Sequence, residues 1–367
     1  MKEIPQDILI YLCCFIPTLN LVQSCTRINH AFHQATQRKA AWINSKHSII
    51  INNSSIRTML FITNLHKMPY LQNLYFENNQ YGGEVSEIVI FQLSDLPNLR
   101  YLTLKEESLM CPGSLLLLKQ KLSCLPLLTY LDLSNNNVAG TTRSHYFFRD
   151  FNDLPLLKTL RLNRLNMSTS ECFHLADSLK LIPSLTELSL EFNQIYSLGL
   201  EYLANLLKDV PWLTSLNLAG NNFTSRSCEV LSKNFQHIPL LTHLNLSSTD
   251  IFRYAYSSCS WFDQLKDLSN LKILNLSNTH MDNEEVLHLS NQFQYLPQLL
   301  SLNLASIGMI PRNMLLCDAI LLHRNLLYLA NLNDLDILNH HVSLDEIRLL
   351  KDQDKFFNIF NLVFDNL

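Results

Sequence analysis

Leucines recur along most of the chain in a fixed pattern of apolar and polar positions. Segments such as LPNLRYLTL, LPLLTYLDLSNNN and VPWLTSLNLAGNNF share a PxLxxLxL core. The first leucines of this core are Leu71, Leu99, Leu128, Leu157, Leu185, Leu213, Leu241, Leu271 and Leu299, at spacings of 28 to 30 residues. The pattern predicts a degenerate tenth copy from Leu327 and a partial first copy around Ile49–Ile51. Such a period indicates a repeat architecture.

Each repeat predicts a strand followed by a turn. The last two leucines of LxxLxL are two residues apart, so both point inward from an extended strand while the residues between them face outward. Asparagines recur about three residues after the strand, where an amide can bond both N–H and C=O groups of a turning backbone. These are Asn79, Asn136, Asn193 and Asn221, and Thr249 and Thr279 can do part of the same work.

The second half of each repeat predicts a helix. In SLGLEYLANLLKDVPWL, one helical face carries Leu200, Leu203, Leu206 and Leu207, and Pro211 is expected to end the helix. A single strand and helix cannot bury its apolar side alone. Stacked neighbours close a continuous core.

The pattern resembles the leucine-rich repeat family, in its ribonuclease-inhibitor-like class. The resemblance covers roughly residues 65–335. It implies an α/β fold, a leucine-rich-repeat solenoid (horseshoe) with a parallel concave sheet and convex helices. A compact α/β enzyme is the alternative, but its strands would not recur at so fixed a period.

The same resemblance implies that a protein partner binds the concave face, without any catalytic residue. Large or charged residues occupy the outward strand positions of the N-terminal half, whereas small polar ones follow in the C-terminal half. The predicted contacts are Tyr75, Glu77, Tyr101, Lys105, Tyr130, Asp132, Arg161, Glu187 and Glu191. Tyrosine and arginine are frequent among binding hot spots. The alternative is an ordinary solvated strand face, with the asparagine column as a structural ladder.

One repeat is longer than most and unusually aromatic. Its segment TDIFRYAYSSCSWFDQL contains Phe252, Tyr254, Tyr256, Trp261 and Phe262. We expect these rings to pack against the adjacent helix layer. A second contact patch is the alternative.

The N-terminal stretch IPQDILIYLCCFIPTLNLVQSC can be a signal peptide, a structural cap or a docking helix. Acidic Glu3 and Asp7 precede its apolar run, and Pro17 interrupts it, which argues against a secretory signal. Two short helices are expected instead, with Pro5 in the first turn of the first one.

This stretch resembles the F-box through Ile4, Pro5, Asp7, Ile8, Leu9, Leu21 and Trp42, although the usual Val-Cys-x-x-Trp is missing. The resemblance implies a substrate-recognition subunit of a Skp1-cullin-F-box type ubiquitin ligase. The Skp1-type partner would contact Ile4, Pro5, Ile8, Leu9 and Leu12. A free-standing binding protein or a secreted bacterial effector, whose N-terminal helices only cap the solenoid, is the other interpretation.

Three regions are therefore expected: a helical module at 1–45, repeats at 46–335 and a capping helix at 336–367. Ser343 and Glu346 form a candidate capping box in the last region. Such a helix would cover the exposed core edge of the final repeat.

Composition agrees with this interpretation. Hydrophobic residues make up 47% of the 367 residues, and a net charge of −4 gives no basic footprint for nucleic acid or membrane surfaces. The nine cysteines form no CxxC pair, which favours reduced thiols in the cytoplasm, or in a host cytoplasm for an effector. No nucleotide-binding or metal motif occurs, so no cofactor and no metal are expected, and the chain is expected to be monomeric alone.

Overall fold

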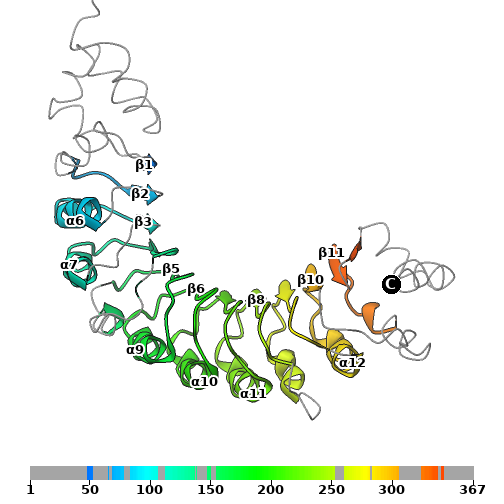
Figure 1. Cartoon of the computed structure of the whole chain (residues 1–367). Coiled ribbons are helices and arrows are strands. Elements are labelled where there is room, and N and C mark those ends of the chain that lie inside the picture. Colours follow the sequence, from blue (N-terminus) through cyan, green and yellow to red (C-terminus); the bar gives the residue numbers. More distant parts are fainter. Residues whose placement is uncertain are drawn as a thin grey trace, which may run out of the picture. The chain divides into compact units, whose positions relative to one another are not determined.

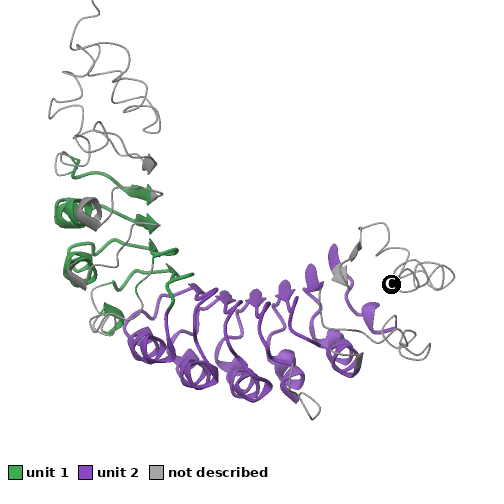
Figure 2. Cartoon of the chain, in the orientation of Figure 1, with its two compact units in different colours: residues 1–166 green, residues 167–367 purple. Residues whose placement is uncertain are grey.

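The computed structural model describes residues 48–52, 65, 68–77, 83–105, 112–136, 138, 147–149, 154–252, 260–281, 283–305, 324–337 and 340–342. The chain divides into two compact units, Met1–Asn166 and Met167–Leu367, coloured separately in Figure 2. The boundary lies within the repeats. The F-box-like module at 1–45, with Ile4, Pro5, Ile8, Leu9 and Leu12, lies outside the described residues. Of the predicted capping region at 336–367, only 336–337 and 340–342 are described, and these are strand residues.

Unit 1 is a parallel ladder of strands with helices along one side (Figure 1). The strands are β1 Ser48–Asn52, β2 Asn73–Glu77, β3 Tyr101–Lys105, β4 Tyr130–Asp132 and β5 Thr159–Arg161. Helix α6 Gly83–Gln92, the 3-10 turn η3 Leu93–Asp95 and helix α7 Pro112–Leu122 connect successive strands. Each strand pairs with the next one along the chain, as short repeats require.

The register of unit 1 stacks equivalent leucines. Leu74, Leu102, Leu131 and Leu160 are aligned across β2 to β5, and each is fully buried. Leucines at one repeat position therefore form a continuous column in the core. This is the arrangement that the sequence pattern predicts.

Unit 2 repeats the same construction. Its parallel strands are β6 Glu187–Ser189, β7 Ser215–Asn217, β8 His243–Asn245, β9 Ile273–Asn275, β10 Ser301–Leu304 and β11 Asp334–Ile337. Strand β12, His340–Val342, pairs antiparallel with β11. The connecting helices are α9 Thr169–Leu179, α10 Ser197–Asn205, α11 Ser225–Lys233 and α12 Asn283–Asn291, with 3-10 turns η4 Leu207–Asp209, η5 Phe235–His237, η6 Ser260–Asp267 and η7 Phe293–Tyr295.

Helix α10 ends earlier than Pro211 predicts. The α-helix stops at Asn205, and the 3-10 turn η4 carries Leu207 into the core before the proline is reached. Leu200 and Leu203 are buried as predicted, whereas Leu206 of the predicted face is half-buried.

The predicted asparagine ladder is confirmed in unit 2. Asn221 is buried; its Oδ1 accepts from the N–H of Ile195, and its Nδ2 donates to the carbonyls of Leu190, Leu218 and Ala219. One amide thus joins two neighbouring repeats. Asn193 makes the same kind of contacts one repeat earlier.

Threonine replaces this asparagine in part, as predicted. The Oγ1 of Thr249 donates to the carbonyl of Leu246, and the Oγ1 of Thr279 donates to that of Leu276, each over 2.6 Å. Each of these hydroxyls bonds a carbonyl three residues earlier in the chain, within its own turn. Asn79 lies outside the described residues.

The predicted start of the tenth copy at Leu327 is wrong. Leu327 is exposed, whereas Leu332 is buried and Ser301 pairs with Asp334. The copy is LANLNDLDI at 329–337, so the preceding connection is longer than in other repeats. The fixed spacing fails because a connection can lengthen without disturbing the strand register.

The aromatic segment of the long repeat packs inward as predicted. Phe252, Trp261 and Phe262 are buried, and their rings contact one another at centroid distances of 4.3 to 6.2 Å. Tyr254 and Tyr256 lie outside the described residues.

Candidate functional site: a tyrosine and arginine face on unit 1

The site lies on the strand face of unit 1 that points away from the leucine core. We call this surface the open face of unit 1 and define it by Tyr75, Tyr101, Thr103, Lys105, Tyr130, Asp132, Thr159 and Arg161. The register aligns seven of these residues in two rows, and Lys105 is aligned with Glu77. Tyr101, Tyr130 and Thr159 form one row, and Tyr75, Thr103, Asp132 and Arg161 form the other.

Two tyrosines stack at the centre of the open face. The rings of Tyr101 and Tyr130 lie 5.6 Å apart at an interplanar angle of 30°. The guanidinium carbon of Arg161 lies 5.6 Å from the centroid of the Tyr130 ring, within the range of a cation–π contact. Tyr101 is 41% exposed, so this stack presents apolar area to the solvent.

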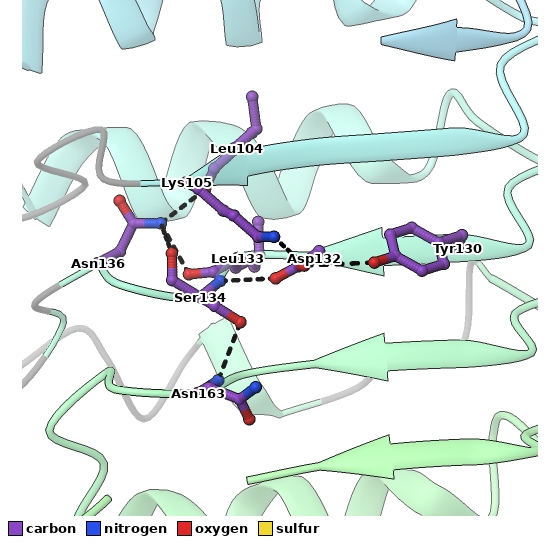
Figure 3. Close-up of polar contacts among 8 residues, drawn as sticks. All are labelled: Leu104, Lys105, Tyr130, Asp132, Leu133, Ser134, Asn136 and Asn163. Carbon is purple, nitrogen blue, oxygen red and sulfur yellow. Dashed lines mark hydrogen bonds and ion pairs between the residues drawn. The ribbon is translucent and has the colours of Figure 1, made fainter. Parts of the chain in front are cut away.

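The buried carboxylate of Asp132 supports the side chains of Tyr130 and Lys105. Asp132 is 1% exposed; its Oδ2 lies 2.9 Å from Nζ of Lys105 and accepts from the Tyr130 hydroxyl over 3.3 Å (Figure 3). Its Oδ1 accepts from the backbone N–H of Ser134 over 3.0 Å. The carboxylate therefore positions a tyrosine and a lysine at once.

Asp132 occupies an outward strand position, as the alternation predicts, but it is buried there and offers almost no surface to a partner. Its neighbours along the row, Thr103 and Arg161, and the side chain of Lys105 leave it almost without exposed surface. It supports the side chains around it.

The acceptor role of Asp132 recurs in unit 2 with asparagine. The Oδ1 atoms of Asn217, Asn245, Asn275 and Asn303 each accept from the backbone N–H two residues further on. This turn contact is the part of the site that sequence reasoning missed. The Asp or Asn that recurs at or next to the end of β4 and of β7 to β10 was the available signal, because Asp and Asn readily bond the backbone two residues on.

Asn136 anchors the turn that follows Asp132. Its Nδ2 donates to the carbonyl of Leu104 in the preceding repeat and to those of Leu133 and Ser134 in its own turn (Figure 3). The Oγ of Ser134 accepts from the N–H of Asn163 in the next repeat. The open face thus rests on a turn bonded to both neighbouring repeats.

The remaining predicted residues are distributed over both units. Tyr75 is half-buried on β2, and Glu77 is aligned with Lys105 in the register, although its side chain is outside the described structure. In unit 2, Glu187 and Glu191 are half-buried, and Oε2 of Glu191 accepts from Nδ2 of Asn217 over 3.0 Å.

The described residues hold neither a metal-ligand cluster nor a membrane-spanning helix. Among them, no group of three or more His, Cys, Asp and Glu side chains is arranged to hold a metal ion. Within the same part of the chain, no helix is long and apolar enough to cross a membrane. Buried Cys172 has a thiol whose pKa is raised to about 12, first by burial and then by the charge of Glu171.

Comparison with known proteins identifies the repeat. Residues 124–141, 182–204 and 211–232 match the family described as Leucine Rich repeat. No curated protein sequence matches the chain. Among solved structures, an internalin (inlF) from Listeria monocytogenes is similar at 18% identity, covering 77% of this chain and 80% of that chain, with a TM-score of 0.39. Parts of the chain therefore match the leucine-rich repeat family, and the strand and helix unit of the matched segments recurs in both units.

Proposed function

We propose that the chain is a non-enzymatic protein-interaction module that captures a protein partner on the open face of unit 1. The stack of Tyr101, Tyr130 and Arg161 is the observation that carries this proposal. Tyrosine and arginine are enriched at binding hot spots because they bury much area and offer polar groups.

The open face also loses little conformational entropy on binding. Asp132 already fixes the hydroxyl of Tyr130 and the ammonium group of Lys105 in the absence of a partner. Immobilising a flexible side chain costs about 0.5–1.5 kcal/mol on association, and an ordered one avoids part of that cost. A pre-organised aromatic cluster is therefore suited to recognition.

A more specific proposal concerns why the chain captures a protein partner. The F-box resemblance at Ile4, Pro5, Ile8, Leu9 and Leu12 supports a substrate-recognition subunit of a Skp1-cullin-F-box type ubiquitin ligase, acting in the cytoplasm. Its N-terminal helices would bind the Skp1-like adaptor while the repeats present the captured protein. The alternative is a free-standing binding protein or secreted bacterial effector whose N-terminal helices cap the repeats.

Site-specific photo-crosslinking tests capture on the open face. A photo-reactive phenylalanine analogue replaces Tyr101 in one variant and Phe91 in another, inside cells that express the full chain. Phe91 is the matched control, since it is a 63% exposed aromatic on helix α6 of the same unit. We expect crosslinked protein from position 101 and far less from position 91. Equal yields from both positions would reject the open face as the site of capture.

Co-elution on size exclusion tests this more specific proposal. A mixture of the purified chain and Skp1 at micromolar concentrations should give a stable complex, and Leu9→Asp should abolish it without changing the thermal unfolding of the repeats. If no complex elutes, the adaptor role fails. If Leu9→Asp strongly lowers the unfolding temperature, the helices are a structural cap.

A further inference from the structure

We infer that the open face of unit 1 selects an acidic peptide segment of its partner, an inference that rests on the proposed function. Three stretches of unit 1 are considered, at residues 100–105, 129–136 and 158–166. Each contains one of the strands β3 to β5 and the residue before it, and the last two also contain the turn that follows the strand. The charged residues in these stretches are Arg100, Lys105, Asp132, Lys158, Arg161 and Arg164. Five are basic and one is acidic.

The single acidic residue of these stretches is hidden. Asp132 is 1% exposed and contacts Lys105, so its charge is not presented at the surface. Arg100, Lys158, Arg161 and Arg164 are exposed. The adjoining strand β2 adds one acidic residue, Glu77, aligned with Lys105. Glu106 and Glu107 follow Lys105 in the sequence, and with them and Glu77 the count is five basic residues to four acidic ones.

The positive character is local. The whole chain carries a formal net charge of −4. In unit 2, the corresponding strand positions carry Glu187 and Glu191, followed by the polar asparagines of β7 to β10. A basic surface on an acidic chain gives charge complementarity to an anionic partner, and such complementarity steers encounter and sets specificity.

The chemistry of the side chains favours carboxylates carried on a peptide. Arginine offers a planar fork of N–H donors that matches a carboxylate in two parallel hydrogen bonds. The stacked Tyr101 and Tyr130 rings lie beside Arg161 and can accept the apolar side chains between acidic residues. A peptide can carry carboxylates and apolar side chains in turn along one chain, so it can contact both the arginines and the tyrosine rings.

Selection from a random peptide library displayed on phage tests this inference, with the full chain as bait. We expect the enriched peptides to contain more Asp and Glu than the unselected library. Their affinity should fall about tenfold or more with Arg161→Glu or Lys158→Glu, because a repulsive charge replaces an attractive one. Arg161→Gln should give a smaller loss in the same direction, and circular dichroism checks that each variant is folded.

Lys272→Glu is the matched control. Lys272 is exposed and occupies in unit 2 the repeat position that Lys158 occupies in unit 1. Its reversal should leave the affinity of the enriched peptides unchanged. A loss as large as that of Lys158→Glu would overturn the inference.

Three further outcomes also overturn it. They are no enrichment at all, enriched peptides without an excess of acidic residues, and tighter binding of labelled oligothymidine than of the best acidic peptide. The last result would indicate a nucleic-acid partner. If position 101 still crosslinks protein in cells, the proposed capture stands while its acidic selectivity fails; if neither assay gives a result, both fail.

Discussion

The Nζ atom of Lys105 lies 2.9 Å from Oδ2 of Asp132, a carboxylate with 1% of its side chain exposed. The two residues come from neighbouring strands of unit 1, and Lys105 is itself 30% exposed. A surface cation is thus fixed by a buried anion. This arrangement connects the stability of the repeat to the geometry of its open face.

Two substitutions of Asp132 separate the effect of its charge from that of its hydrogen bond to the turn. Asp132→Asn keeps an oxygen for the N–H of Ser134, as the equivalent asparagines of unit 2 do, so the free energy of unfolding should fall by less than about 1 kcal/mol. Asp132→Ala removes every contact and should cost about 2 kcal/mol. Urea denaturation of the two variants measures the difference, and equal losses would contradict the assigned turn role.

Asn221 should be among the most sensitive polar positions of unit 2. Its amide bonds four backbone groups from a site that is 2% exposed, so Asn221→Ala removes four hydrogen bonds at once and should cost about 3 kcal/mol. Asn221→Thr should lose less, because threonine at positions 249 and 279 retains one of these contacts. Denaturant titration measures both effects.

The neighbouring Asn222 provides the control for this series. Its side chain is exposed, and its backbone N–H donates to the carbonyl of Ile195, a bond that alanine preserves. Asn222→Ala should change stability by less than about 0.5 kcal/mol. A loss similar to that of Asn221→Ala would show that the turn tolerates no substitution.

The repeat could be predicted from the sequence because its physics is local. Leucine spacing fixes which side of each strand is buried, and the asparagine after the strand can satisfy only a turning backbone. Residues 1–45 do not follow the 28-to-30-residue leucine period, so the same reasoning does not extend to them. The shift of the tenth copy from Leu327 to Leu332 shows the limit, since spacing alone cannot detect a lengthened connection.

The open face could be predicted only in part. Strand alternation correctly places Tyr101, Tyr130 and Arg161 together. The burial of Asp132 could not be predicted in the same way, because it depends on how the side chains of two other strands close over it. Burial of a polar residue is a tertiary property, whereas alternation is a local one.

Gly220 is predicted to resist substitution. Its φ is +64°, and an added Cβ would lie 2.3 Å from Cδ1 of Phe192. Gly220→Ala should therefore lower the free energy of unfolding by about 2 kcal/mol, from the left-handed backbone and the ring contact together. Differential denaturant titration of the variant against the parent chain measures the loss.

A double variant separates these two causes. Phe192→Ala removes the ring, so Gly220→Ala should cost about 1 kcal/mol less in that background than in the parent chain. Ser248→Ala is the control, since Ser248 has a φ of 55° at the same repeat position and already carries a Cβ. Additive losses in the double variant would show that the ring contact is unimportant.

Cys172 is predicted to be unreactive in the folded chain. Burial and the nearby Glu171 raise the pKa of its thiol to about 12, so at mildly alkaline pH it remains protonated, and the thiolate is the reactive form. Half-buried Cys124 should be alkylated first. Mass spectrometry of iodoacetamide-treated protein measures both sites, and equal labelling of Cys172 and Cys124 before unfolding would contradict the assigned burial.

Capture on the open face is tested most directly by the affinity of a partner recovered by crosslinking from position 101. We predict that Tyr101→Ala with Tyr130→Ala raises its Kd by about tenfold or more, because truncating a hot-spot residue costs at least about 1–2 kcal/mol. The paired control, Phe91→Ala with Leu116→Ala, removes exposed apolar side chains from the helices of the same unit and should leave the Kd unchanged. An unchanged Kd in the tyrosine variant, or an equal rise in both, would contradict capture on the open face.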